Sequence, residues 1–583
     1  MSNFKAVLHR VWPFFQLMLT MAWLSNLAET DAYFSIYVII SFFSFYLQII
    51  SFHSDISQSA SRSTLIVVLS VLFSFSVLLA NYPLFTTIGD PAVIGRSTSI
   101  LVNLINTILS FLGGYFTVSP IFRYVFCRFP IPCVRFGNDQ KAGWIPFAVF
   151  FSFLFFNLIH LFLVEYPGNV TEDPFTQISE MVSGYYSNFN TFWHTMLLRT
   201  ILSAAYFIFS DLNVAIACFC IFQIIILAFS FTYCLVTMRD FGVPKYFLIA
   251  AYGIYAFIPY HIALSITIWK DVLFAAGCLI FVTAWLRILK KLGSRRILDY
   301  FLFGAGSILF LLSRTNGWMI YLFSFLFGLF YIRKNRSFTV MMGSLAIFGW
   351  FLLNPALSIL NVPGGDPVES LSIPIQQVSR VIVDGCTLSE EDKSLLSKVV
   401  DLDEVSELYT NWLSDPMKEE IRSKNLSYFE DHISDYARLW IRLGVQYPAE
   451  YLKAWVDQTK GYWNGGYDYF LYSETITDNP YGVEKRIGSN PIASLFRLYF
   501  GLSRHVIFFE PLHSIGLHVW IAFLCFALNV VRKREHFVIS LPVLILIVGL
   551  WFGTPVFCSF RYVYPLFVSF PLILSTAIFA SET

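Results

Sequence analysis

The sequence predicts an all-α polytopic membrane protein, and its composition and its apolar runs both indicate this class. The chain has 583 residues, of which 56% are hydrophobic and 13% are charged, whereas soluble domains carry about 25% charged residues. Its mean hydropathy is +0.64. A water-soluble core cannot hide this much apolar surface, so a soluble enzyme, a disulfide-stapled secreted module and a disordered chain are excluded. The net charge of +1 gives no general attraction to nucleic acid.

Repeated apolar runs of roughly 20 residues predict about fourteen membrane-spanning helices. The runs cover residues 11–28, 33–52, 64–82, 98–119, 145–164, 213–237, 246–266, 272–290, 298–313, 317–332, 338–358, 511–531, 537–555 and 561–580. Lys5 and Arg10 precede the first run. Because many spans follow it, we expect this run to be a membrane anchor rather than a cleaved signal peptide.

The loop charges predict the orientation of these spans. One set of loops is basic, and by the positive-inside rule it is cytoplasmic. Its members are Arg123, Arg128, Arg135, Lys141, Arg239, Lys245, Arg287, Lys290, Lys291, Arg295, Arg296, Arg333, Lys334, Arg336, Arg532, Lys533 and Arg534. The opposite loops hold few cations, and residues 165–193 hold none. We therefore expect both termini in the cytoplasm and the loop at 165–193 outside the cell.

The segment 191–210 tests this orientation. It is apolar, but if it crossed the membrane every later basic loop would lie outside. It is short, holds Arg199 in its middle and begins with the aromatic residues Phe192 and Trp193. Aromatic residues favour the membrane interface, so we expect a helix lying on the outer surface.

The chain divides into four parts by hydropathy. Residues 1–144 hold about four spans and a basic loop, 145–360 hold further spans with a first outer loop at 165–212, and 511–583 hold the last spans. The hydrophilic stretch 361–510 predicts an extracytoplasmic helical domain. Its helical signals are the capping-box-like pattern that begins at Ser389 and the prolines at 416 and 448, where helical runs begin.

Two outward-facing clusters contain acidic residues. Glu172 and Asp173 follow the fifth span, and Gln177 lies one turn later. A carboxylate beside a partly dry cavity can act as a base toward a hydroxyl, although a solvated loop acid has the same sequence pattern. Lys270 and Asp271 lie at the mouth of the eighth span, either as a surface ion pair or as a phosphate-binding pair.

Two more clusters place an arginine at the mouth of a helix. Arg314 and Asn316 lie in a turn between two spans, and Arg561 with Tyr562 begins the last span. Arginine binds phosphate with two parallel hydrogen bonds, whereas an arginine that only anchors the chain at lipid headgroups is the simpler alternative. Cationic residues are scarce on the outer face, yet three of these four clusters contain one, namely Lys270, Arg314 or Arg561. This favours transfer from a lipid-linked phosphosugar.

Six motifs resemble the GT-C superfamily of polytopic glycosyltransferases, which use polyprenyl-phosphate sugars, and most closely a bacterial family of uncharacterised membrane proteins. They begin at Tyr166, Gly184, Thr267, Ser313, Ser372 and Arg561, within roughly 145–580. The resemblance implies a GT-C-like catalytic core at 145–360. It assigns Asp173 as the catalytic base, Lys270 and Asp271 as the second acidic motif, and Arg314 as the donor-phosphate arginine. Many members of the family that it resembles carry His-Pro where this chain has Asn190 and Thr191.

The function expected from these residues is inverting sugar transfer to a cell-envelope acceptor (a glycan, a teichoic acid or a lipid) on the outer face. Lys270, Arg314 and Arg561 would bind the donor phosphate. The residues expected to support substrate binding are Glu172, Gln177, His194, Asp271, Asn316, Gln376, Gln377 and Tyr562. Some GT-C members use a divalent cation, but the outer acids do not cluster as metal ligands here. The alternatives are a transporter or flippase for lipid-linked saccharides and a glycan ligase or polymerase.

Overall fold

A computed structural model describes residues 2–28, 34–51, 60–82, 96–129, 131–132, 143–292, 296–332, 335–466, 476–488, 490–506, 509–553 and 556–580. The basic-loop residues Arg135, Lys141, Arg295, Arg333 and Lys334 lie outside these ranges. Within the ranges the chain is mostly helical, and two strands of two residues each pair in parallel. The protein is therefore an all-α, multi-pass membrane protein.

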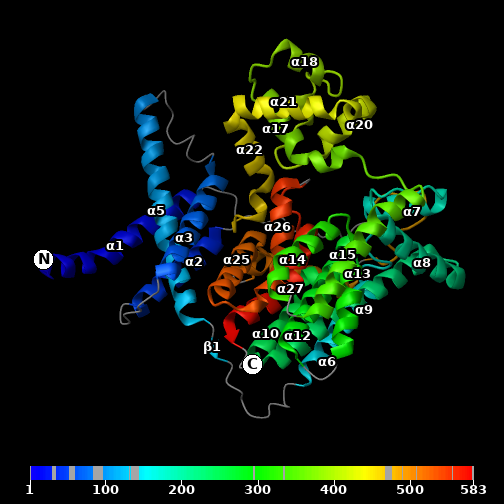
Figure 1. Cartoon of the computed structure of the whole chain (residues 1–583), viewed down its shortest axis with the longest axis horizontal. Coiled ribbons are helices and arrows are strands. Elements are labelled where there is room, and N and C mark those ends of the chain that lie inside the picture. Colours follow the sequence, from blue (N-terminus) through cyan, green and yellow to red (C-terminus); the bar gives the residue numbers. More distant parts are fainter. Residues whose placement is uncertain are drawn as a thin grey trace.

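The N-terminal helices form a group beside the rest of the molecule (Figure 1). They are α1 (Ser2–Leu27), α2 (Phe34–Ser51), α3 (Ala60–Ala80) and α5 (Arg96–Arg128), followed by β1 (Ile131–Pro132). An edge-to-face contact between Phe73 on α3 and Trp520, with ring centroids 5.2 Å apart, joins this group to the C-terminal helices. At the other edge of the group, β1 pairs with β2 (Phe579–Ala580) near the C-terminus.

The main bundle is built around one central helix, α12, which is buried from Asp271 to Ile288 and contacts α9, α13 and α27. Its members are α6 (Ile145–Leu163), α9 (Leu212–Phe241), α10 (Lys245–Phe257), α11 (Pro259–Ser265), α12 (Lys270–Lys290), α13 (Arg296–Ser313), α14 (Gly317–Ile332), α15 (Arg336–Leu353), α16 (Pro355–Ile359), α25 (Ile515–Val531), η5 (Glu535–Ser540), α26 (Leu541–Gly553) and α27 (Phe560–Ile578). A helix apolar on all sides is expected at such a central position.

Nine helices in the described ranges are long and apolar enough to cross a membrane, or ten if a bent pair counts as one span. The bent pair is α10 and α11, which meet at 45°. The bend follows from Pro259, which has no N–H and disfavours a helical conformation at Ile258. Each of the fourteen expected spans coincides with a helix, but α1 is not among the nine, and α2, α13, α14 and α25 are shorter apolar helices. The nine include α8 (Phe192–Phe209), which has the length and composition of a span although the loop charges predict that it lies on the outer surface. The count of fourteen therefore stays a prediction.

A second group of helices lies at one end of the bundle (Figure 1). It consists of η3 (Pro367–Leu371), α17 (Ser372–Val383), α18 (Glu390–Leu396), α19 (Val405–Leu408), α20 (Asp415–Asp431), α21 (Ile433–Gln446), α22 (Pro448–Thr459) and η4 (Lys460–Tyr462). Its helices from η3 to α21, with the start of α22, enclose a hydrophobic core of their own, which includes Val381, Phe429 and Leu443. We call η3 to α22 the helical domain.

The rest of the hydrophilic stretch packs against the membrane helices instead of joining the helical domain. The Thr477 N–H donates to the Val170 carbonyl at 3.0 Å, and α23 (Pro491–His505) contacts α6 and α11. A short helix, α24 (Glu510–His513), precedes α25. The stretch 361–510 therefore contains a compact helical domain and a return segment that lies on the bundle.

Candidate functional site

The first outer loop is fastened to the start of α12. The Asn169 N–H donates to the Ile266 carbonyl at 2.9 Å, and the Ile268 N–H donates to the Asn169 carbonyl at 3.1 Å. Gly168 makes this approach possible, because its φ is +123° and a Cβ there would lie 2.5 Å from the Cys220 sulfur. The helix that follows, α7 (Glu172–Ser183), therefore begins next to the N-terminal end of α12.

Five charged side chains meet at this point, and we call them the charged cluster: Asp173, Lys270, Asp271, Arg314 and Arg561. Arg561 Nη1 donates to Asp173 Oδ2 at 3.0 Å, and Lys270 Nζ lies 3.9 Å from the same oxygen. Arg314 donates to the Asp271 carboxylate. The five residues come from α7, α12, the turn before α14, and α27, so the cluster exists only when these helix ends come together.

Aromatic rings hold the two guanidinium groups. The Arg314 guanidinium carbon lies 4.8 Å from the centre of the Tyr562 ring. The Arg561 guanidinium carbon lies 5.1 Å from the Trp269 ring and 5.0 Å from the Tyr562 ring. Arginine stacks on aromatic faces through its planar, delocalised charge. Tyr562 therefore lies between both arginines and fixes their relative positions.

The charged cluster has more positive than negative groups and retains unused hydrogen-bonding capacity. It contains three cations and two carboxylates, which leaves one positive charge uncompensated. In the described part of the chain, three buried polar atoms at or beside the cluster have no hydrogen-bond partner: Asp271 Oδ2, Arg561 Nε and Asn316 Oδ1. Buried polar groups without partners are rare in native proteins. Arg561 Nε is a donor suited to an anion, whereas Asp271 Oδ2 and Asn316 Oδ1 are acceptors suited to hydroxyl groups. Together with the excess positive charge, these atoms indicate a site for a polar ligand that carries a negative charge and hydroxyl groups.

The carboxyl group of Asp173 is ionised in this environment. Burial alone would raise its pKa, but the positive charges of Lys270 and Arg561, the hydrogen bond from Arg561 and the charge of Arg314 outweigh burial and hold the pKa below its ordinary value. Its side chain is still 33% exposed. The carboxylate is therefore accessible, and it is charged at neutral pH.

Behind the charged cluster, several polar side chains connect α7 to α8 (Phe192–Phe209) by hydrogen bonds. Helix α8 points away from the bundle (Figure 1). Asn190 Oδ1 accepts a hydrogen bond from Lys270 Nζ at 2.7 Å, and Asn190 Nδ2 donates to the Asp173 carbonyl at 3.4 Å. Gln177 Nε2 donates to Thr195 Oγ1 at 2.8 Å and lies 3.0 Å from His194 Nδ1. Asn190 thus positions both Lys270 and Asp173.

Asn190 is the residue of this site that sequence reasoning missed as a functional residue. In the sequence it stands out only as a departure from the His-Pro expected from the GT-C resemblance. No periodicity or spacing indicates that its side chain contacts Lys270, 80 residues later. Gln177 and His194, in contrast, were expected near the site, and the structure puts them in the layer behind the charged cluster.

Three other expected residues have different surroundings. Glu172 is exposed on the first turn of α7. Gln376 Nε2 donates to the Thr410 carbonyl at 2.7 Å, while Gln377 accepts from Trp440 Nε1 at 2.8 Å. The two glutamine amides therefore make their hydrogen bonds inside the helical domain and its loop at Thr410, and not with the charged cluster. In the described ranges, no three His, Cys, Asp or Glu side chains gather as metal ligands would.

A family model matches residues 181–583, which is more than half of the chain. The chain belongs to the DUF6020 family. This is a family of unknown function. The range matched by DUF6020 contains Lys270, Asp271, Arg314 and Arg561, while Asp173 and the N-terminal helices precede it. No curated protein and no solved structure matches the chain.

Proposed function

We propose that this DUF6020 protein is an inverting membrane glycosyltransferase. It moves a sugar from a polyprenyl-phosphate donor to a hydroxyl group of a cell-envelope acceptor, which is a glycan, a teichoic acid or a lipid. The observation that carries the proposal is the charged cluster, in which an accessible carboxylate touches cations at the end of membrane helices. A lipid-linked phosphosugar has a phosphate for the cations and an anomeric carbon for the acceptor.

Lys270, Arg314 and Arg561 are the groups that bind the donor phosphate. When the bond between the anomeric carbon and the phosphate oxygen breaks, negative charge grows on the departing lipid phosphate. Positioned cations stabilise that charge more strongly in a partly dry site than in water. The exposed fractions of the three side chains, 17%, 15% and 18%, support this, because all three are largely shielded from solvent.

Asp173 is the base in this mechanism. Without a donor, its carboxylate is engaged by Arg561 and Lys270. A bound phosphate attracts the same cations, so their hold on Asp173 weakens and its affinity for a proton rises. The carboxylate then takes the proton of the acceptor hydroxyl. The acceptor oxygen forms the new bond to the anomeric carbon as the lipid phosphate leaves, and the configuration at the anomeric carbon is inverted.

The orientation of the charged cluster relative to the membrane is part of the same proposal. Lys270 and Arg561 lie at the first turns of α12 and α27, whereas Arg287 and Lys290 lie at the last turn of α12. Arg534 donates to the Thr576 carbonyl at 3.2 Å, at the far end of α27. Under the positive-inside rule, this basic end faces the cytoplasm, together with both termini, and the charged cluster faces outward.

Substitution of Asp173 by Asn tests the proposed mechanism. Asn keeps the size of the side chain but accepts no proton, so we expect Asp173→Asn to lower sugar transfer by roughly 100-fold or more while the protein still folds. The assay uses purified protein in liposomes, a panel of polyprenyl-phosphate hexoses and envelope acceptors, with and without EDTA to detect a need for divalent cations.

Glu391→Gln is the control for the loss of a carboxylate, because Glu391 is an exposed acid on α18 of the helical domain, outside the charged cluster. It should retain transfer near the wild-type rate. Near-normal turnover by folded Asp173→Asn protein would contradict the assignment of the base. Transfer by neither the wild type nor the control, with any donor in the panel, would contradict the proposed function itself.

A further inference from the structure

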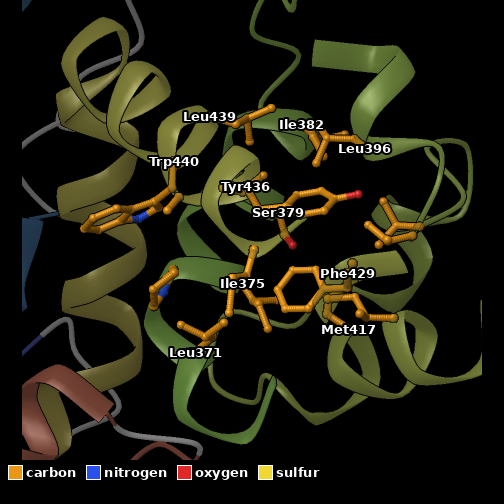
Figure 2. Close-up of a pocket in the computed structure, with 17 residues that line it drawn as sticks. Leu371, Ile375, Ser379, Ile382, Leu396, Met417, Phe429, Tyr436, Leu439 and Trp440 are labelled. Carbon is orange, nitrogen blue, oxygen red and sulfur yellow. The ribbon is translucent and has the colours of Figure 1, made fainter. Parts of the chain in front are cut away.

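The helical domain contains a cavity of about 270 Å³ between α17, α20 and α21. Figure 2 shows 17 side chains around it. Leu371, Ile375, Phe429 and Leu439 are among them, and none of the lining residues is charged. The cavity is separate from the charged cluster, because its walls belong to the core of the helical domain.

A cavity of this size is unusual in the interior of a domain. Native cores are packed as densely as organic crystals, and few of their voids exceed the size of a water molecule. An apolar cavity of roughly 150 Å³ is enough to stay dry and bind benzene. An empty cavity would cost stability, because its walls lose dispersion contacts. An apolar ligand is the occupant that restores those contacts.

One side chain in the cavity indicates that the ligand also carries a polar atom. Ser379 is 3% exposed, and Figure 2 shows its hydroxyl directed into the cavity, between Tyr436 and Phe429. It has no hydrogen-bond partner among the described residues, although a helical serine usually donates to a carbonyl one turn earlier. The Tyr436 hydroxyl, in contrast, is satisfied, because it donates to the Leu395 carbonyl at 2.9 Å.

The rim of the cavity gives a route for entry. Ile433 and Ala437 lie one turn apart on α21 and both line the cavity. Ile433 is 41% exposed and Ala437 is also exposed. The cavity therefore opens to the surface along one edge of α21, and a chain-shaped ligand can enter there while its polar end stays near solvent.

We propose that this cavity binds one hydrocarbon chain of a neutral lipid and that Ser379 donates a hydrogen bond to the ester carbonyl of that lipid. A monoacylglycerol is the simplest ligand of this class. The absence of charged lining residues argues against an ionised head group inside the cavity, because a buried charge without a partner is strongly unfavourable. The inference goes beyond sugar transfer and does not rest on it.

Photolabelling of the full-length protein in liposomes tests this site. The probe is a monoacylglycerol with a diazirine on a ten-carbon chain, and unlabelled monoacylglycerol of the same length is the competitor. We expect labelled peptides from α17 and α21, with labelling suppressed by the competitor. Ala437→Trp places a large side chain at the rim and should lower labelling at least 10-fold. Val445→Trp is the matched control, because Val445 lies on the same helix, is 80% exposed and does not line the cavity.

A second variant removes only the hydrogen bond. Ser379→Ala keeps the cavity and should weaken competition by the monoacylglycerol roughly 2- to 10-fold, as expected for one hydrogen bond, while competition by decane stays unchanged.

Equal labelling of wild-type and Ala437→Trp protein would overturn the proposal. Stronger labelling by a diazirine fatty acid or phospholipid would overturn the assignment to neutral lipids. Asp173→Asn should label like the wild type, which separates this site from the proposed enzyme activity.

Discussion

The ion pairs of Asp173 determine how this residue responds to pH. Its pKa in the folded protein is lowered, whereas an unfolded chain has a carboxyl pKa of about 3.9. The pairs therefore stabilise the fold at every pH above about 4, and that contribution disappears only as the pH falls through the lower folded value. Because the side chain is 33% exposed, solvent screening keeps the contribution small.

The pH dependence of sugar transfer is predicted to differ between free and donor-bound protein. The acid limb of kcat/KM reports the free enzyme. In the free enzyme the neighbouring cations hold the pKa of Asp173 below its ordinary value, so this limb should lie below about pH 4. The acid limb of kcat reports the donor complex and should lie at higher pH, since the donor phosphate shares Lys270 and Arg561. Steady-state kinetics between pH 3.5 and pH 8, with donor saturating or limiting, measures both. A kcat/KM limb at a higher pH than the kcat limb would contradict this prediction.

Close packing of α12 on α13 sets the geometry of the charged cluster at the level of helices. A Cβ on Gly277 would lie 2.7 Å from the Phe310 nitrogen, and one on Gly306 would lie 2.8 Å from the Phe281 nitrogen. Small residues let membrane helices approach closely. α12 begins with Lys270 and Asp271, and α13 ends next to Arg314. The distance between these two helices therefore determines whether Arg314 reaches Asp271.

Gly277→Ala is predicted to destabilise the bundle and weaken donor binding. The added methyl group meets backbone atoms of α13, which cannot rotate away, so we expect a loss of about 1–3 kcal/mol and a several-fold higher KM for the donor. Gly549→Ala on α26 is the control, because no atom lies within 4 Å of a Cβ there. Thermal unfolding in detergent and donor titration measure the two effects. Equal unfolding temperatures for the two variants would count against the packing explanation.

The whole molecule has two chemically different ends. At one end lie the charged cluster and the helical domain. At the other end Arg287 donates to Asp299 at 2.7 Å and to Asp240 at 2.8 Å, which ties α12 to α13 and α9. Arg532 donates to the Phe126 and Phe129 carbonyls, both at 2.9 Å, and so holds α5 at the same end. A membrane that crosses the bundle separates these two ends.

Cysteine labelling is predicted to show which end faces outward. Glu430 is exposed on the helical domain, and Lys291 is exposed at the basic end, so a cysteine at either position is accessible to a reagent on its side of the membrane. With a membrane-impermeant maleimide on intact cells, Glu430→Cys should react, whereas Lys291→Cys should react only after permeabilisation. The eight cysteines of the described ranges are buried or partly buried, and the unsubstituted protein gives the background. The reverse pattern would contradict the proposed orientation of the active site.

The sequence by itself determined the class of the protein, the positions of its helices and most of the polar residues near the site. Apolar runs, prolines and loop charges are local signals, and a helix satisfies its own backbone hydrogen bonds, so its position can be predicted without knowledge of its neighbours. Asp173, Lys270, Arg314 and Arg561 were recognisable because charged residues at helix mouths are rare in such an apolar chain.

The tertiary structure alone decided which helix ends meet. Asp173 pairs with Arg561 across 388 residues, Asn190 takes a positioning role, and the hydrogen bonds of Gln376 and Gln377 stay with the helical domain and its loop. The cavity at Ser379 likewise depends on how α17, α20 and α21 pack. These features come from contacts between segments far apart in the chain. Such contacts depend on the shapes of whole helix surfaces, and no local pattern encodes them.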